Sequence, residues 1–153
     1  MEAPWGNEEM REIRSIIVAL SVFLPGSAFA ESIAMCGQTV EYTMAAPEPD
    51  VPADMRAFSG VWVGGWETNK LCSVLVVEAV EKDGAVKATY IWGTYPGWNI
   101  FKPGFLKWSG AISSGALKLP PNARGDYVAY KMKNPQTLDG LFNGRTQGTF
   151  TKR

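Results

Sequence analysis

From residue 58 to the C-terminus, the chain alternates between apolar and polar residues in short runs separated by turn residues. In the stretch 58–66 two tryptophans, Trp62 and Trp66, fall on one face of an extended chain with a glycine between them, and valines fall on the other face. This pattern is typical of a β-strand that is buried on its indole-bearing side. We therefore predict that 58–66 is the first strand of a β-rich domain.

The turn residues recur at short intervals, which favours hairpins over units in which strands alternate with helices. The two strongest turn signals are Asp83-Gly84 and Asn143-Gly144, because such pairs accommodate the positive φ angles of tight hairpins. The predicted strands are 58–66, 72–80, 85–92, 105–112, 116–119, 126–133, 136–142 and 145–152.

Short antiparallel connections between these strands predict an all-β fold, an eight-stranded antiparallel up-and-down barrel, with a β-sandwich as the alternative. Residues 93–104 interrupt the alternation with Pro and Gly but carry Tyr95, Trp98 and Phe101. We predict an irregular aromatic loop there, since structureless connections of this length are often functional.

The N-terminal region has the organisation of a secretory signal peptide. Arg11 and Arg14 precede an apolar run over 16–24, and Ala28 and Ala30 supply the small residues of a cleavage site, so we expect a cut after Ala30. The run is too short for a permanent membrane span. Alternatives are an amphipathic helix of a cytosolic protein and, for the acidic first residues, a true start at Met10.

The chain is thus divided into an N-terminal extension with the signal at 1–30, an N-terminal segment with a Pro-rich linker at 31–57, and a barrel domain at 58–153. We expect a single helical turn over 54–57, capped by Asp54. A signal peptide implies a periplasmic or secreted protein, where cysteines oxidise.

Cys36 and Cys72 are the only cysteines, so one disulfide between the N-terminal segment and the second strand is expected. A lipoprotein anchor at Cys36 is an alternative, but Met35 is not the small residue that should precede it. A redox-active pair is another, although the spacing is not that of a C-x-x-C motif.

Composition narrows the range of functions. The 153 residues include fifteen basic and fifteen acidic side chains and no histidine. Balanced charge gives no basic surface for nucleic acid, and the lack of histidine disfavours a triad hydrolase or a zinc site. The carboxylates Glu67, Glu78, Asp126 and Asp139 are dispersed, Glu78 at a strand end where solvent exposure is expected, so no catalytic pair is predicted. We expect a non-enzymatic protein without a cofactor or metal.

The Gly60-Val61-Trp62 triplet at the start of such a strand series resembles the calycin group, which includes the lipocalins and avidins. The resemblance implies that Trp62 packs across the closed end of the barrel against a basic residue of the last strand, with Arg145, Lys152 and Arg153 as candidates, and that Gly60 and Trp62 are structural.

Further details resemble avidins, namely a hairpin over 75–90, the run Trp108-Ser109-Gly110 and the ending 148–152. The positions where avidins carry polar biotin-binding side chains are occupied here by Gly64, Gly65 and Trp92, so biotin binding is not expected.

Several aromatic residues fall on the inward face or in the nearby loop, and such rings either line a ligand cup or fill the barrel. The candidate ligand-binding residues are Trp66, Tyr90, Trp92, Tyr95, Trp98 and Trp108. We expect an exported barrel that binds a small hydrophobic or aromatic ligand. The alternative is a periplasmic protein-binding module, such as an inhibitor of a secreted hydrolase, which uses the 93–104 loop to contact its partner.

Overall fold

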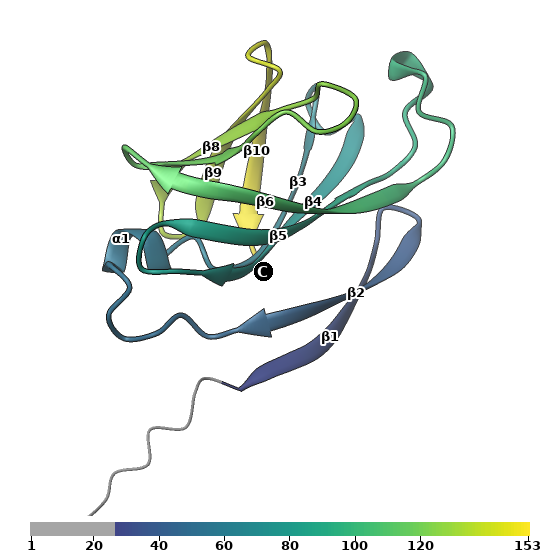
Figure 1. Cartoon of the computed structure of the whole chain (residues 1–153). Coiled ribbons are helices and arrows are strands. Elements are labelled where there is room, and N and C mark those ends of the chain that lie inside the picture. The colour runs from purple at the N-terminus through teal and green to yellow at the C-terminus, as the bar shows by residue number, and fades with distance from the viewer. Residues whose placement is uncertain (1–26) are drawn as a thin grey trace, which may run out of the picture.

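Eight antiparallel strands close into a barrel in the computed structural model, which describes residues 27–153 (Figure 1). Each strand pairs with the next along the chain, and the last pairs with the first. The all-β barrel prediction is therefore confirmed, and the sandwich alternative is wrong. The strands are β3 (Gly60–Trp66), β4 (Leu71–Val80), β5 (Ala85–Trp92), β6 (Gly104–Ser113), β7 (Ala116–Leu119), β8 (Val128–Asn134), β9 (Thr137–Phe142) and β10 (Thr146–Lys152).

The first barrel strand begins at Gly60 rather than at residue 58, because the turn that follows a short helix occupies the predicted start. α1 (Ala53–Arg56) has Pro52 rather than Asp54 at its N-cap and no side-chain cap. Backbone hydrogen bonds from Phe58 and Ser59 to the helix then hold the chain in a turn. The strand starts only at Gly60, whose φ of +127° favours glycine.

The barrel interior is filled by large side chains that lie against glycines. Trp62, Trp66, Tyr130 and Phe150 are fully buried. A Cβ at Gly148 would lie 2.7 Å from the indole of Trp66. Replacing a strand glycine by any larger residue there would displace the ring, so the glycines position the aromatic core.

Segment 31–57, expected to be an N-terminal segment with a Pro-rich linker, contains most of a hairpin formed by β1 (Ala28–Met35) and β2 (Gln38–Ala45). A tight turn at Cys36-Gly37, with both φ angles positive, joins the two strands. The predicted cleavage site lies inside β1, whereas residues 1–26, with most of the predicted signal, lie outside the described residues.

The β1–β2 hairpin covers the outside of the barrel at β4 and β5 (Figure 1). Ile33 and Val40 of the hairpin pack with Val74, Val76 and Ile91 of the barrel wall, and all five are buried. Beneath the hairpin, the wall is therefore apolar on both faces over 74–77 of β4. This explains the continuous apolar run there, which a strand exposed on one side would not have.

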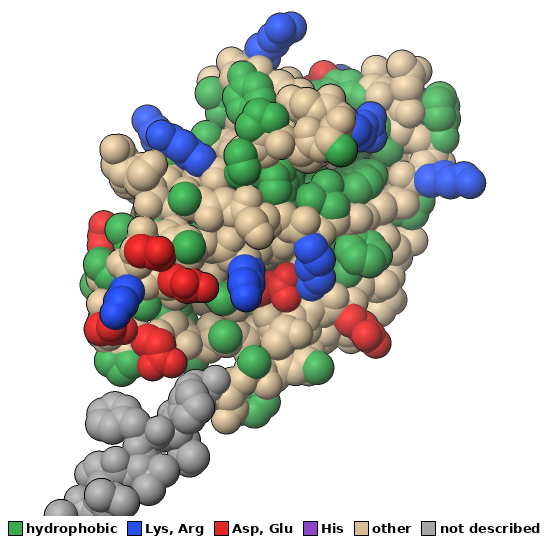
Figure 2. All heavy atoms as spheres, in the orientation of Figure 1, with side chains coloured by type: hydrophobic (Ala, Val, Ile, Leu, Met, Phe, Trp, Pro, Cys, Tyr) green, Lys and Arg blue, Asp and Glu red, His purple; other side chains and the backbone are tan. Residues whose placement is uncertain are grey.

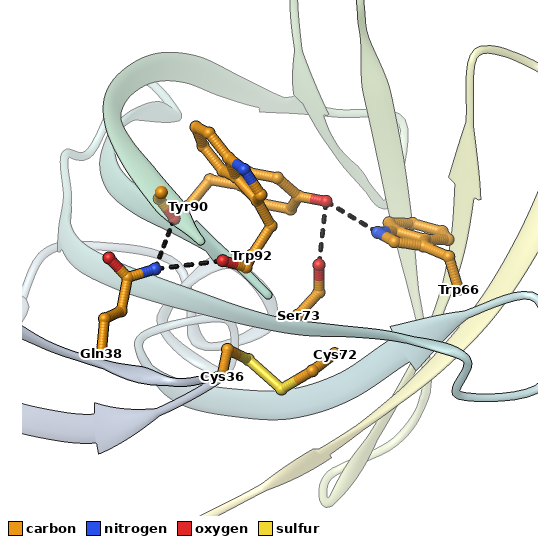
Figure 3. Close-up of a disulfide and its surroundings, with 8 residues drawn as sticks. Cys36, Gln38, Trp66, Cys72, Ser73, Tyr90 and Trp92 are labelled. Carbon is orange, nitrogen blue, oxygen red and sulfur yellow. Dashed lines mark hydrogen bonds between the residues drawn. A yellow bond between two sulfur atoms is a disulfide. The ribbon is translucent and has the colours of Figure 1, made fainter. Parts of the chain in front are cut away.

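A disulfide joins the hairpin turn to β4, as predicted (Figure 3). The Cα atoms of Cys36 and Cys72 are 5.5 Å apart, and the bond leaves neither sulfur free. Beside it, the side-chain amide of Gln38 donates to the carbonyl oxygens of Trp92 at 3.0 Å and Gly104 at 2.8 Å. The hairpin turn is thereby fixed to β4, β5 and the start of β6.

Glu78 connects the other end of the hairpin to the barrel. Its carboxylate accepts hydrogen bonds from the backbone of Thr43 at 2.9 Å, from the hydroxyl of Thr89 and from Lys107 at 2.9 Å. Burial alone would raise the pKa of Glu78, but these bonds outweigh it and hold the pKa below its ordinary value. The expectation that Glu78 is exposed to solvent was wrong, because a β-bulge between Val77 and Ala79 lies at this position beneath β2.

The predicted aromatic loop is irregular except for one 3₁₀ turn, η1 (Pro96–Trp98), and it lies at the opposite end of the barrel from α1 (Figure 1). Acidic and basic side chains share the molecular face shown in Figure 2, with hydrophobic side chains between them. Within residues 27–153 no helix is long and apolar enough to cross a lipid bilayer.

Candidate functional site at the open end of the barrel

The end of the barrel near α1 is closed by Trp62. Its indole N–H donates to the carbonyl oxygen of Phe58 at 2.8 Å, and the ammonium of Lys152 lies 5.0 Å from the ring centroid. Lys152 also donates to Ala57 at 3.0 Å, and burial lowers its pKa. Of the three basic candidates, Lys152 is therefore the one on Trp62. A Cβ at Gly60 would lie 2.9 Å from the Lys152 side chain, which explains the glycine.

The opposite end holds a cavity of about 170 Å³. Strands β4, β5, β6 and β9 and the loops 93–103 and 120–127 contribute to it. The lining is mostly aromatic and aliphatic, with a polar group on one side. The residues that line it are Leu71, Tyr90, Trp92, Trp98, Ile100, Leu106, Trp108, Asn122, Arg124, Asp126 and Phe142.

The aromatic loop is held over this end by Glu67. The hydroxyl of Tyr95 donates to one carboxylate oxygen at 2.6 Å, and the indole N–H of Trp98 donates to the other at 2.7 Å. The bond from Tyr95, and then that from Trp98, hold the pKa of Glu67 below its ordinary value. Because Trp98 also packs on Phe142 with ring centroids 5.5 Å apart, the loop is fixed to two sides of the opening.

Tyr90 forms the inner part of the cavity wall, and its hydroxyl is held from behind. The indole N–H of Trp66 donates to it at 2.7 Å, and the hydroxyl of Ser73 lies 3.0 Å away (Figure 3). Burial raises the pKa of Tyr90 to about 12, and the charge of Asp126 acts in the same direction. Tyr90 is therefore a neutral, fixed ring at neutral pH.

The polar side of the opening comes from the loop between β7 and β8. The side-chain oxygen of Asn122 accepts hydrogen bonds from the backbone N–H groups of Arg124 and Asp126, which fixes the loop. The carboxylate of Asp126 accepts a bond from the side-chain amide of Asn143 at 2.9 Å. The guanidinium of Arg124 lies 3.9 Å from the other carboxylate oxygen, and its side chain is 76% exposed.

Four of the six predicted ligand-binding residues line the cavity: Tyr90, Trp92, Trp98 and Trp108. The other two do not. Trp66 is fully buried behind Tyr90, and Tyr95 packs beside Trp98, with ring centroids 5.9 Å apart. Trp66 and Tyr95 thus support the lining rather than form it.

Sequence reasoning did not identify Glu67, Asn122, Arg124 or Asp126 as parts of the site. Glu67 directly follows the β3 tryptophan and has a positive φ, so it turns toward the loop at the strand end. Asn122 follows two prolines, a common place for a side chain that stabilises a turn. Neither signal shows that these residues meet at one opening, because that depends on barrel closure.

The described residues contain no group of three or more His, Cys, Asp or Glu side chains that could hold a metal ion. The cavity offers aromatic rings and aliphatic side chains, with the amide of Asn122, the guanidinium of Arg124 and the carboxylate of Asp126 on its polar side. Such an arrangement is suited to holding a small molecule by stacking and exclusion of water.

Tyr130 provides a test of how the inner wall is built. Its hydroxyl is fully buried and has no hydrogen-bond partner among residues 27–153, whereas the Tyr90 hydroxyl has two. We expect Tyr90→Phe to lower the free energy of unfolding by about 1–3 kcal/mol, because it leaves the Trp66 N–H unpaired. Tyr130→Phe should leave stability unchanged or raise it by about 1 kcal/mol.

Urea denaturation of both variants measures this difference. Equal destabilisation by the two substitutions would contradict it and would mean that the Tyr130 hydroxyl has a partner of its own.

The sequence matches no protein-family model, and no curated protein matches it significantly.

Proposed function

We propose that this protein is an exported, non-enzymatic barrel of the calycin type that binds a small apolar or aromatic ligand at its open end. The observation that carries the proposal is the cavity between the wall of Tyr90, Trp92 and Trp108 and the opposite pair Trp98 and Phe142. The ring centroids of Tyr90 and Trp92 are 6.0 Å apart, and those of Tyr90 and Trp108 are 5.7 Å apart. Because the Tyr90 and Trp108 rings are nearly perpendicular, at 81°, a flat molecule between the two walls stacks on one of them and meets the edge of the other.

Two observations support export to the periplasm or the exterior of the cell. The signal-like sequence precedes the barrel, and the disulfide between Cys36 and Cys72 is of a kind that persists in oxidising compartments. The calycin assignment is supported by the closed barrel and by Lys152 on Trp62, which is the arrangement that the resemblance implies.

Tryptophan fluorescence and calorimetric titration with a panel of small hydrophobic and aromatic compounds test ligand binding. We expect Trp98→Ala to weaken binding by about tenfold, since it removes one wall of the cavity. Phe101→Ala is the matched control, because Phe101 lies in the same loop, is 69% exposed and does not line the cavity. A panel with no binder, or equal losses in the two variants, would contradict this function.

A second candidate function is protein binding through the same loop region. Phe101 and Phe105 are 69% and 50% exposed, which is unusual for large apolar side chains. This function predicts the reverse order of effects. Phe101→Ala should weaken the capture of a protein partner from periplasmic extract. Trp98→Ala, which leaves Phe101 and Phe105 in place, should weaken that capture less.

A further inference from the structure

Three of the four cavity-lining aromatic residues that carry a polar atom have that atom engaged elsewhere. The indole N–H of Trp98 is bound to Glu67 at 2.7 Å, and that of Trp108 to the carbonyl oxygen of Pro120 at 2.9 Å. The Tyr90 hydroxyl is held by Trp66 and Ser73. Ring faces carry the negative part of the aromatic quadrupole, so a cavity lined by them attracts positive charge.

The rim adds a carboxylate whose charge is only weakly neutralised. Asp126 lines the cavity, and its hydrogen-bond donor is the uncharged amide of Asn143. Arg124, the cation nearest to it, is 3.9 Å away and largely exposed, so solvent screens most of that attraction. Tyr90 lines the same cavity as Asp126, and burial first, then the charge of Asp126, raises the pKa of Tyr90.

We propose that the cavity takes a small organic cation with a methylated ammonium group, held between the faces of Tyr90, Trp92, Trp98 and Trp108 with Asp126 as its counter-ion. This inference rests on the proposed ligand-binding function and narrows it to one chemical class. An apolar or aromatic body contacts the aliphatic residues, and the ammonium group contacts the rings.

The polar groups of the cavity favour a methylated ammonium over a primary amine. A primary ammonium needs several hydrogen-bond acceptors when it leaves water. The side-chain oxygen of Asn122 already accepts two backbone bonds, which leaves the carboxylate of Asp126 as the acceptor at the rim. A methylated ammonium has few or no N–H groups to satisfy and binds ring faces directly.

Matched pairs of ligands test the charge preference. Choline is compared with its neutral carbon analogue, in which a quaternary carbon replaces the nitrogen, and phenyltrimethylammonium is compared with tert-butylbenzene. Each pair has the same shape, so a difference in affinity reports on the charge. We expect each cation to bind about tenfold more tightly than its neutral partner, as measured by calorimetry.

Two rim variants separate the contribution of the carboxylate. Asp126→Asn keeps an oxygen that can accept the Asn143 bond, and we expect it to weaken cation binding by about tenfold while the neutral ligands change by less than about twofold. Arg124→Gln removes an opposing positive charge from the same cavity lining, so we expect it to strengthen cation binding.

Equal affinities within each pair would overturn the preference for a cation but leave the proposed function intact. Failure of all four ligands, together with the hydrophobic panel, would reject both. Weaker cation binding in Arg124→Gln, or no loss in Asp126→Asn, would also overturn the assignment of Asp126 as counter-ion.

Discussion

Replacement of Trp62 by alanine is expected to lower the free energy of unfolding by about 3–5 kcal/mol, the range found for large buried aromatic residues. Trp62 is fully buried, with 0% of its surface accessible to solvent, and it closes one end of the barrel. Its loss also leaves the carbonyl of Phe58 without its donor and Lys152 without the ring beneath its ammonium. Urea denaturation measures the change.

Trp62→Phe and Phe101→Ala are the controls for this effect. The first keeps most of the buried apolar area and should cost less than Trp62→Ala. The second removes a 69% exposed ring and should change stability by less than about 0.5 kcal/mol. A loss below about 1 kcal/mol in Trp62→Ala would contradict the structural role of this residue.

Removal of the disulfide by the double substitution Cys36→Ser and Cys72→Ser is expected to cost about 3–4 kcal/mol in the chain-entropy model for a sequence separation of 36 residues. The hairpin should be affected first, because its turn is held to β4 by this bond. Limited proteolysis should then cut within β1 or β2 before it cuts the barrel.

The double variant is compared with the wild-type protein under oxidising conditions and with the wild-type protein under reducing conditions. If the reduced protein and the double variant both unfold at the same denaturant concentration as the oxidised protein, the disulfide does not stabilise this fold.

The barrel itself was predictable because each of its strands has a local signal. The Asp83-Gly84 and Asn143-Gly144 turns are both used, with Gly84 at φ +89° and Asn143 and Gly144 at +49° and +68°. Strand β5 has the predicted bounds, since its apolar residues alternate without interruption between two turns. Local rules and the global fold agree along this part of the chain.

The β1–β2 hairpin was not predicted, although Val40, Tyr42 and Met44 do alternate with polar residues. Its turn is Cys36-Gly37, and cysteine is not one of the residues that mark such turns. The prolines that follow the hairpin predicted a Pro-rich linker, and no strand was predicted before that linker. The position of the hairpin on the barrel also depends on long-range contacts. The apolar outward side chains of β4 indicate that some segment covers them, but they do not show which one.

The candidate site was predictable only in part, for a similar reason. Alternation places Tyr90 and Trp108 inside the barrel, and both line the cavity. The same rule places Trp66 inside, but its indole lies over Gly140 and Gly148 and so belongs to the core. The position of Asp126 at the rim depends on the β7–β8 loop, whose path no periodic pattern specifies.

The hairpin is fastened to the barrel by two kinds of chemistry at its two ends. The disulfide at Cys36 yields to a reductant, and the carboxylate of Glu78 loses its charge only in acid. Because the folded-state pKa of Glu78 is lowered, the stability that it contributes is fully present above the pKa of an ordinary glutamate and is lost progressively as the pH falls from there through the lowered pKa. Reduction at neutral pH therefore leaves the Thr43 end attached, and acid in an oxidising medium leaves the Cys36 end attached. Both attachments are therefore weakened together only in a medium that is both acidic and reducing.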